Sequence, residues 1–467
     1  MARIAMIVGN PCSPDYRVIK EAEALAGLGH EVRVFCVAKV GVPDLESING
    51  VTYQRQMVGR PPAGAKAEIA TSGDNGFDVS LLDRTDPRRI YVATKSRLRT
   101  LMNLMMWPAT WVFRRIRKNT QQFRKFALTS HCFAPPVVAW HPEVVHAHDL
   151  LCLPAGLAAA KAAGARLVYD SHELETHRNP PLPLLLRSYY AFEERRAIRK
   201  ANAVITVCEP IADHLRDAYR IERPVVLFNA PPVRRPDEPK QAEGAIPRRH
   251  IRRDSGVPDN AKLAVYVGLV TINRGVETVL ESLANLPDVW LAAVGPQNAK
   301  YTAKLLDHAR QLGVEARFSM LPPVPPGDVV DYIADADFGV NPLIPATLSY
   351  QYAMPNKLFE MAFAGLPIVN SDAQESARFV RTHGLGVIFR SGDSADCAKA
   401  MALIARNPAS FRQSSENLSR LCNTYGWHSQ ARKLASLYDR IGQEEPKWQT
   451  NARSIGLSSG QMRMARG

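Results

Sequence analysis

The sequence has few cysteines and no long hydrophobic run, and both absences narrow the setting of the protein. Its 467 residues include seven cysteines, an odd number without a Cys-x-x-Cys pair, which suits a reducing cytosol and argues against a disulfide framework. No stretch reaches the roughly 18 apolar residues that a membrane span requires. The apolar run near the start, Ile4 to Val8, is too short for the core of a signal peptide. We therefore expect a cytoplasmic protein.

Acidic residues are missing from one segment, 88–142, which contains 11 lysines and arginines and no Asp or Glu. The formal net charge of the whole chain is +14, so this segment supplies most of the excess, and a nucleic-acid-binding surface along the whole chain is not expected. The middle of the segment, LMNLMMWPATWVF, is apolar and lies between KSRLR and RRIRK. This pattern predicts a basic, apolar insertion that docks on an anionic membrane surface without spanning it.

Short apolar runs alternate with helical patterns in both halves of the chain, which predicts an α/β fold with doubly wound parallel sheets. The segment NAPPVRRPDEPKQAEGAIP is rich in proline and charge and is typical of a linker. We expect an N-terminal Rossmann-like domain over 1–229, a linker over 230–247, a C-terminal Rossmann-like domain over 248–425, a helix over 426–441 and a mobile tail over 442–467. Ligands of such sheets bind in the cleft outside the carboxyl ends of the strands.

The loop after the first expected strand reads GNPCSPDYRV. It has a single glycine, Gly9, and therefore lacks the three-glycine fingerprint of a dinucleotide site. Two interpretations stay open for its polar residues. Asp15 caps the following helix in an ordinary turn, or Asp15 and Arg17 face the cleft and touch a substrate.

Two further expected strands end in the polar sequences HAHD and DSHE. They place His146, His148, Asp149, Asp170, His172 and Glu173 at neighbouring strand ends. Two histidines two residues apart on a strand share a face, so a metal centre is one interpretation. Hydrogen-bonded histidines that close the strand ends are a second. We favour a third, a metal-free polar site that orients a hydroxyl-bearing substrate.

The second domain contains two candidate anion-binding positions. In YVGLVTINRGVE, Gly268 ends a strand and Arg274 precedes a helix, whose free N–H groups can bind an anion. In SYQYAMPNKLFEMAFAGLPIVNS, Pro355 opens a largely apolar helix with Lys357 in its first turn, where the helix dipole disfavours a cation by roughly 0.3 to 1 kcal/mol. A bound phosphate would offset that conflict, and Glu360, one turn on, could accept hydrogen bonds from a ribose. The alternative is a surface ion pair between Lys357 and Glu360.

Four segments that occur in order carry a family resemblance. They are RVIKEAEALAGLGHEVRVF, VVHAHDLLCLPAGLAAAKAAGARLVYDSHELE, YVGLVTINRGVETVLESL and PNKLFEMAFAGLPIV. Over about residues 1 to 440 the chain resembles the retaining glycosyltransferases of glycosyltransferase family 4. That resemblance implies the GT-B architecture, in which two Rossmann-like domains face each other across a cleft. It also implies transfer of a sugar from a nucleotide diphosphate sugar, without metal or cofactor.

The resemblance assigns roles to individual residues. Glu360 matches the second, ribose-binding glutamate of the family's pair, Arg274 its basic diphosphate position and His172 the histidine near the reacting sugar. We therefore predict catalytic roles for His172, Arg274 and Lys357, donor binding by Gly268, Arg274, Asn356, Lys357, Leu358 and Glu360, and acceptor binding by Asp15, Arg17 and His148. The chain departs from the pattern at Tyr352, where the family has its first glutamate, and at Leu269, where a basic residue is common.

The expected reaction joins the sugar, with retention, to an acceptor hydroxyl on a lipid-linked or polysaccharide precursor. The expected partners are the nucleotide sugar, the glycan or lipid-linked acceptor and the inner face of the cytoplasmic membrane, with no nucleic acid. Three rivals stay open: a metal-dependent hydrolase that uses His146, His148 and His172, a nucleotide-sugar epimerase on the same fold, and a non-catalytic scaffold on the membrane.

We predict that the protein binds vesicles of anionic lipid at low salt and is released at high salt. Each basic side chain near a charged surface contributes about 1 kcal/mol, and salt screens that attraction. Co-sedimentation with anionic and neutral vesicles measures the effect. Binding that ignores lipid charge and salt would contradict the electrostatic part of the prediction, and no binding at all would contradict the whole.

Overall fold

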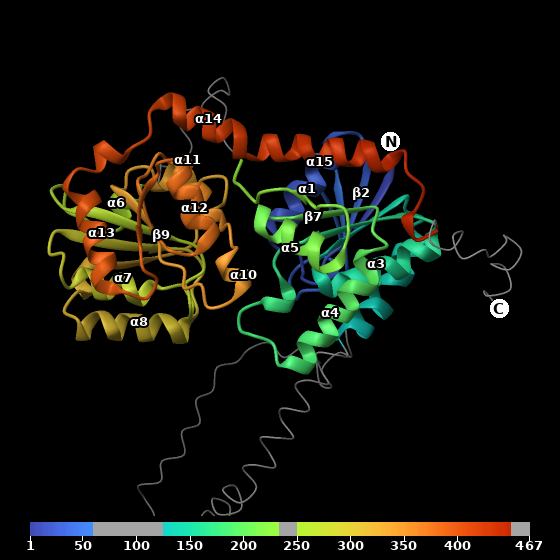
Figure 1. Ribbon diagram of the computed structural model, residues 1–467, viewed down its shortest axis with the longest axis horizontal. Coiled ribbons are helices and arrows are strands. Elements are labelled where there is room, and N and C mark those ends of the chain that lie inside the picture. Colours follow the sequence, from blue (N-terminus) through green and yellow to red (C-terminus); the bar gives the residue numbers. More distant parts are fainter. Residues whose placement is uncertain (59–124, 233–249, 450–467) are drawn as a thin grey trace, which may run out of the picture.

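The computed structural model describes residues 1–58, 125–232 and 250–449. They form two α/β domains that lie side by side, each with a central sheet between helices (Figure 1). This architecture confirms the predicted GT-B arrangement of two Rossmann-like domains.

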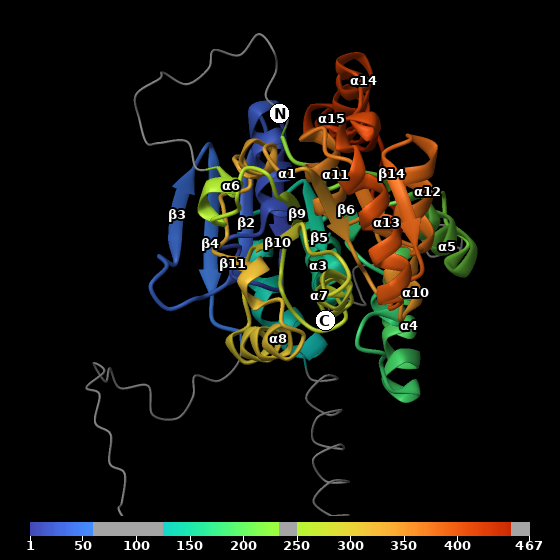
Figure 2. The same cartoon turned by 90° about the vertical axis from the view of Figure 1, so that its left-hand side faces the viewer.

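The N-terminal domain contains an eight-stranded sheet in the order β3-β4-β2-β1-β5-β6-β7-β8. Every neighbouring pair is parallel except β3 and β4, which form the outer edge of the sheet (Figure 2). The strands are β1 (Arg3–Ile7), β2 (Glu31–Val37), β3 (Leu45–Ile48), β4 (Val51–Gln56), β5 (Val144–His148), β6 (Arg166–Ser171), β7 (Ala203–Thr206) and β8 (Val225–Val226). The sequence interpretation missed the antiparallel pair.

The C-terminal domain contains a six-stranded, fully parallel sheet in the order β11-β10-β9-β12-β13-β14. Its strands are β9 (Lys262–Val267), β10 (Val289–Val294), β11 (Phe318–Leu321), β12 (Phe338–Asn341), β13 (Ile368–Ser371) and β14 (Gly386–Phe389). The central strand β9 is buried along nearly its whole length, as expected for parallel strands with helices on both faces.

Helices connect the strands and cover both sheets. In the N-terminal domain they are α1 (Tyr16–Gly27), α3 (Asp149–Ala163), η2 (Glu175–His177), α4 (Leu184–Ile198) and α5 (Glu209–Tyr219). In the C-terminal part of the chain they are α6 (Ile251–Asp254), α7 (Val276–Leu283), α8 (Ala299–Gln311), η3 (Glu315–Arg317), α9 (Val329–Ile333), α10 (Leu348–Gln351), α11 (Asn356–Phe363), α12 (Gln374–Thr382), α13 (Ser394–Arg406), η4 (Pro408–Phe411), α14 (Ser415–Tyr425) and α15 (Trp427–Gly442).

Helix α15 returns from the C-terminal domain and packs on the N-terminal one (Figure 1). Lys20 of α1 lies where the chain crosses between the domains. Its ammonium donates to the Asn229 side chain at 2.9 Å and to the Ala230 carbonyl at 2.6 Å, and lies 4.7 Å from the centre of the Trp427 ring. One lysine of the N-terminal domain thus contacts both crossings of the chain.

The predicted mobile tail over 442–467 needs a correction at its beginning. Residues 443–449 lie against the N-terminal domain: the Trp448 indole donates to the Ala165 carbonyl at 3.0 Å, and the Asn202 amide donates to the Glu445 carbonyl at 2.9 Å. These contacts give the segment partners that its polar sequence does not reveal. Residues 450–467 lie outside the described part of the chain.

The predicted membrane-docking insertion over 88–142 also needs a correction. Its last part, residues 125–139, is helical, and Phe126, Phe133 and Val137 are at most 3% exposed in the core of the N-terminal domain. These apolar side chains are therefore structural. Residues 88–124 lie outside the described residues. Within the described part, no helix combines the length and hydropathy needed to cross a membrane.

We predict that Phe133→Ala lowers the free energy of unfolding by roughly 3 to 5 kcal/mol, because it empties a fully buried aromatic position. His131→Ala, on an exposed position of the same helix, should leave stability nearly unchanged. Urea unfolding of both variants measures the difference. Equal stability of the Phe133 variant and the wild type would show that this helix is not part of the folded domain.

Candidate active site

A buried ion pair organises the polar residues at the strand ends of the N-terminal domain. Arg17 of α1 is 3% exposed and Asp170 of β6 is fully buried. Nε and Nη2 of Arg17 each donate to one carboxylate oxygen of Asp170 at 2.8 Å, and Nη1 donates to the Leu227 carbonyl at 2.9 Å. Against the effect of burial, Arg17 and His172 hold the pKa of Asp170 well below its ordinary value. Asp170 is therefore a fixed anion.

His172, beyond the end of β6, lies between two carboxylates. Its Nε2 is 3.0 Å from Asp170 Oδ2, and its Nδ1 is 3.3 Å from Asp149 Oδ2. Burial by itself would lower the pKa of His172, but Asp149 and Asp170 raise it well above its ordinary value. Asp149 itself has a φ of 61° at the turn from β5 into α3, an uncommon conformation for a non-glycine residue. The side chain of His172 stays 19% exposed, so the imidazolium reaches the surface of the site.

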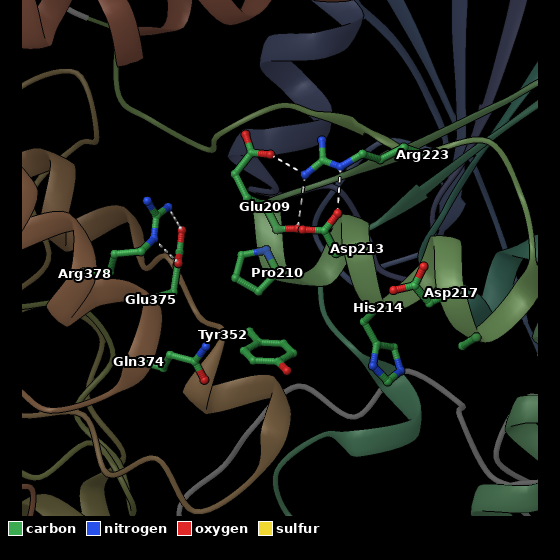
Figure 3. A pocket seen from close by; sticks show the side chains of 11 residues that line it. Glu209, Pro210, Asp213, His214, Asp217, Arg223, Tyr352, Gln374, Glu375 and Arg378 are labelled. Carbon is green, nitrogen blue, oxygen red and sulfur yellow. Dashed lines mark hydrogen bonds and ion pairs between the residues drawn. The ribbon is translucent and has the colours of Figure 1, made fainter.

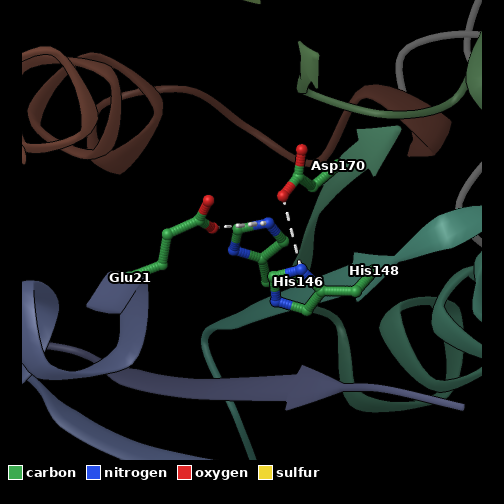
Figure 4. Close-up of side chains that lie close together, drawn as sticks. All are labelled: Glu21, His146, His148 and Asp170. Atoms are coloured by element: carbon green, nitrogen blue, oxygen red, sulfur yellow. Dashed lines mark ion pairs between the residues drawn. The ribbon is translucent and has the colours of Figure 1, made fainter. Parts of the chain in front are cut away.

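His148, His146 and Glu21 extend the cluster into the core (Figure 4). His148 Nδ1 lies 3.4 Å from Asp170 Oδ2, and the rings of His148 and His146 stack with centroids 4.3 Å apart. His146 Nε2 lies 3.8 Å from Glu21 Oε2. Burial and Asp170 raise the pKa of Glu21 to about 7. All three side chains are fully buried.

This cluster was also the candidate metal site. Among the described residues, ligand atoms of Glu21, His146, His148 and Asp170 lie within 4.8 Å of one another. The guanidinium of Arg17 already lies 2.8 Å from Asp170 and 3.2 Å from Glu21. A divalent ion on the same carboxylates would lie beside that cation, and like charges repel strongly where water is excluded. The geometry therefore favours Arg17 as the cation of the cluster.

Asp15 and Arg17 were predicted to bind the acceptor, and the structure gives both side chains hydrogen-bond partners within the N-terminal domain. Asp15 caps α1 by accepting from the Val18 amide at 3.4 Å, and it also accepts from the Asn10 side chain at 2.7 Å. Arg17 is buried behind Asp170. Asp15 thus acts as the N-cap of α1, as one of the two interpretations expected. Arg17 holds Asp170 in place from the buried side of the cluster.

Across the cleft, α11 begins as the sequence predicts. Its N-cap is Pro355, and Gly365 follows its end with a φ of 68°. Lys357 in the first turn is 7% exposed, and its ammonium lies 3.8 Å from the centre of the Tyr266 ring. Burial and Arg274 hold the pKa of Lys357 well below its ordinary value. Among the described residues no ion pair forms between Lys357 and a carboxylate, so the surface pair with Glu360 is not the explanation of this lysine.

Arg274 is a second cation at the same place. Its guanidinium lies 5.4 Å from the centre of the Tyr350 ring, and its Nε is buried without a hydrogen-bond partner in the described part of the chain. Gly275 fixes the loop after it: the φ is 76°, and a Cβ there would lie 1.9 Å from the Pro342 carbonyl oxygen. Neither Lys357 nor Arg274 forms an ion pair with a carboxylate of residues 1–58, 125–232 or 250–449, so a bound anion would have two cations to pair with here.

Gly268 ends β9 directly beside Lys357. A Cβ on Gly268 would lie 3.7 Å from Cε of Lys357, and its φ is 112°, a conformation that favours glycine. The backbone at this strand end can therefore come close to the lysine and to whatever the lysine binds.

Of the other predicted donor residues, Asn356 and Glu360 are at least partly exposed, whereas Leu358 is not. Asn356 is exposed at the start of α11. Burial raises the pKa of the half-buried Glu360 to about 7, against the effect of Lys357 and Lys20. Leu358 is fully buried, and its amide donates to the Pro355 carbonyl at 2.9 Å. Leu358 therefore packs the domain, and the structure does not support a donor contact by its side chain or its N–H.

A cavity of about 870 Å³ lies between the two domains, with α5 on one side and α12 on the other (Figure 3). Tyr352, which occupies the place of the family's first glutamate, lines this cavity together with Gln374. The Tyr352 carbonyl also accepts a hydrogen bond from the Cys208 thiol across the domain boundary at 3.0 Å. At this position the chain has a contact between domains where a carboxylate was expected.

A second cavity, of about 250 Å³, lies within the N-terminal domain next to the partner of His172. Its lining includes Asp149, Lys125, Glu175, Arg178 and Tyr190. Arg178 pairs with Glu175 at 3.1 Å, and burial and Glu173 raise the pKa of Glu175 to about 7. Sequence reasoning missed Lys125, Glu175 and Arg178, because they come from segments far apart in the chain with no motif in common.

The N-terminal domain thus holds His172 between two carboxylates, and the C-terminal domain places Lys357 near Arg274 without an ion-pair partner among the described residues. The family model described as Glycosyltransferase Family 4 matches residues 73–230, and the one described as Glycosyl transferases group 1 matches residues 247–420. Together they cover more than two thirds of the chain. The protein belongs to the glycosyltransferases of family 4, and it is an enzyme of this class.

Curated relatives and solved structures agree with that assignment. The chain is 24% identical over 315 residues to the D-inositol 3-phosphate glycosyltransferase of Thermobispora bispora, which covers 63% of this chain and 70% of that protein. The enzyme of the same name from Corynebacterium kroppenstedtii is 26% identical over 217 residues, 44% of this chain and 47% of the relative. The second match thus spans about half the length of the relative.

Two solved structures show the fold over nearly the whole chain. The sucrose-phosphate synthase of Thermosynechococcus elongatus has a TM-score of 0.67 at 16% identity and covers 94% of this chain and 99% of that one. HepE of Anabaena, solved with UDP and glucose, has a TM-score of 0.64 at 14% identity and covers 94% and 100%. At this level of identity the likeness is one of fold.

We predict that Lys357→Met raises the melting temperature of the nucleotide-free protein and reduces its further rise on addition of UDP. A lysine whose folded pKa lies below its ordinary value costs most stability at acidic pH, where it must carry a proton. That cost fades as the pH approaches the ordinary value of about 10.4. The gain in the Met variant should therefore be largest at the acidic end of the stable range. Thermal melts over a pH series measure it.

Lys304→Met, at an exposed position of α8, is the matched control and should change neither melting temperature nor response to UDP. A Lys357 variant that melts below the wild type and keeps the full UDP response would contradict the assignment of Lys357 to an anion site.

Proposed function

We propose that the protein transfers a sugar from a nucleotide diphosphate sugar to an acceptor hydroxyl with retention of configuration. The observation that carries this proposal is the buried Lys357 beside the half-buried Arg274, whose Nε is itself buried. Burying a cation without a counter-ion costs several kcal/mol, and here two lie together with no carboxylate partner among the described residues. A diphosphate would supply the missing negative charge and the missing acceptor for Arg274 Nε.

On the donor side, the same two cations would stabilise the charge that develops on the leaving diphosphate, which is the main electrostatic task of the reaction. Glu360 lies one turn beyond Lys357 on α11. It is too deep for a phosphate, which it would repel, and is suited to accept hydrogen bonds from the ribose. Gly268 and the free N–H groups at the start of α11 would bring backbone donors to the phosphates.

On the acceptor side, His172 cannot serve as a general base while both its nitrogens face carboxylates. A doubly protonated imidazole has no lone pair to accept a proton. It can hold positive charge and a fixed orientation beside the reacting centre. The proton of the acceptor hydroxyl would then pass to the leaving phosphate during attack on the same face as departure. This is the route proposed for the retaining family.

The acceptor would enter the N-terminal domain through the 250 Å³ cavity beside Asp149. Its lining of carboxylates, Arg178 and Lys125 suits a hydroxylated group, so a polysaccharide precursor or a lipid-linked sugar fits this proposal. Names of the relatives point to phosphorylated acceptors for those proteins. Docking on the inner face of the cytoplasmic membrane would bring a lipid-linked acceptor within reach.

We predict that UDP, GDP or ADP, or one of their sugars, raises the melting temperature of the protein, since preferential binding stabilises the folded state. Glu360→Ala should weaken the preferred nucleotide roughly tenfold or more, as expected for loss of a charged hydrogen-bond acceptor. Glu416→Ala, at an exposed position of α14, should not. Isothermal titration after a thermal-shift panel measures both. Stabilisation no greater than that by inorganic phosphate would contradict the nucleotide-sugar proposal.

A further inference from the structure

The C-terminal helix α15 reaches the buried cluster of the N-terminal domain through one side chain, Tyr438. This residue lies beyond both family-model matches, the later of which ends at residue 420. It is 4% exposed, and its hydroxyl lies 2.9 Å from Nδ1 of His146. A buried phenol needs a hydrogen-bond partner, and His146 is the one that the structure gives it.

The direction of this hydrogen bond follows from the surroundings of His146. Burial holds the pKa of His146 well below its ordinary value and that of Tyr438 well above it, so both groups are neutral near pH 7. A neutral imidazole carries one proton. Nε2 of His146 has no hydrogen-bond partner among the described residues and lies 3.8 Å from Glu21 Oε2, and we infer that the negative potential of this carboxyl group places the proton on Nε2. Nδ1 then accepts from the Tyr438 hydroxyl.

From His146 a series of electrostatic contacts and hydrogen bonds leads to His172, and its first step, from His146 Nε2 to Glu21 Oε2, is an electrostatic contact at 3.8 Å. Glu21, which His146 faces, lies 3.2 Å from Arg17, and Arg17 donates to Asp170 at 2.8 Å. Asp170 lies 3.0 Å from Nε2 of His172. A shorter branch runs from His146 to His148 by ring stacking, and His148 Nδ1 lies 3.3 Å from Nε2 of His172.

We propose that Tyr438 is a positioning residue for His172, because its hydroxyl fixes the tautomer of His146 and thereby the orientation of the charged groups around His172. Helix α15, whose first residue Trp427 contacts Lys20 where the chain returns to the N-terminal domain, therefore contributes to the geometry of the N-terminal site. The groups that face His172 or act on it are Arg17 and Glu21 of α1, His146 and His148 of β5, Asp149 of α3, Asp170 of β6, and Glu173.

Tyr438→Phe isolates the hydroxyl, because phenylalanine fills the same volume and removes one oxygen. Without that donor, Nδ1 of His146 loses its partner and the imidazole is free to adopt the other tautomer. The imidazole proton then moves from Nε2, which faces Glu21, to Nδ1. The contact of Glu21 with Arg17 loses its fixed geometry, and so does the contact of Arg17 with Asp170. Asp170 would hold the proton of His172 less firmly, so His172 should titrate at lower pH in the variant.

The experiment uses the full chain labelled with ¹⁵N-histidine and needs no substrate. Long-range ¹H–¹⁵N correlation spectra report the tautomer of each histidine, and a pH series reports where His172 titrates. His146→Gln and His172→Gln variants assign the signals. We expect the Nε2–H tautomer at His146 in the wild type, its loss in Tyr438→Phe, and an earlier titration of His172 in that variant.

Tyr219→Phe is the matched control. The Tyr219 hydroxyl is also buried, and it donates to the carboxylate of Glu194 at 2.6 Å. Neither residue is among the groups named above around His172. The Tyr219→Phe variant should leave both signals unchanged. An Nδ1–H tautomer at His146 in the wild type, as a metal on Nε2 would produce, overturns the proposal. So does an unchanged titration of His172 in Tyr438→Phe.

A kinetic arm rests on the proposed function and is separable from the spectra. Tyr438→Phe should lower kcat several-fold and move its pH profile to lower pH, with the KM for the nucleotide sugar unchanged, since α11 and Arg274 are untouched. A purely structural role would instead show as a lower melting temperature with the pH profile unmoved. If no sugar transfer is found at all, the proposed function fails and the spectra still decide the role of Tyr438.

Discussion

The buried ion pair between Arg17 and Asp170 is the interaction on which the N-terminal site depends. It joins α1 to β6, and through the Leu227 carbonyl it also holds the chain just before the first crossing to the C-terminal domain. Removing one partner from such a pair leaves an uncompensated buried charge, typically at a cost of 3 to 5 kcal/mol, about the same as losing a large core side chain. Because Asp170 stays ionised, His172 can be held as a cation at the edge of the cleft.

The two domains solve the problem of buried charge in opposite ways. In the N-terminal domain the cations of Arg17 and His172 have carboxylates within 3.0 Å. In the C-terminal domain Lys357 and Arg274 form no ion pair with a carboxylate of the described residues, and under the proposed function the nucleotide diphosphate supplies the counter-charge. Under the proposed function, the charges of the N-terminal site are balanced without a ligand, whereas those of the C-terminal site are balanced only when the nucleotide sugar is bound. We therefore expect a ligand to raise the free energy of unfolding most by binding at the proposed donor site.

The crossing between the domains connects these two halves. Lys20 contacts both crossings, and its pKa is lowered to about 7, chiefly by burial and by Arg17. Burial raises the pKa of Glu360, in the proposed donor site, to about 7, and the charges of Lys357 and Lys20 act against that shift. Lys20 therefore interacts electrostatically with Arg17 and Glu21 of the N-terminal cluster on one side and with Glu360 of the C-terminal domain on the other.

Much of this molecule could be predicted from its sequence, because the relevant signals are local. Apolar runs of strand length alternating with helical patterns indicate two doubly wound sheets, and a lysine in the first turn of the apolar helix α11 indicates an anion. Only the tertiary structure decided which polar residues work together. It buries Arg17 behind Asp170, places Leu358 in the core, draws residues 125–139 into the N-terminal domain and brings Tyr438 to His146 across 292 positions of sequence. Local patterns fix what a segment becomes, but the partner of a buried charge or hydroxyl depends on chain crossings that no short stretch of sequence contains.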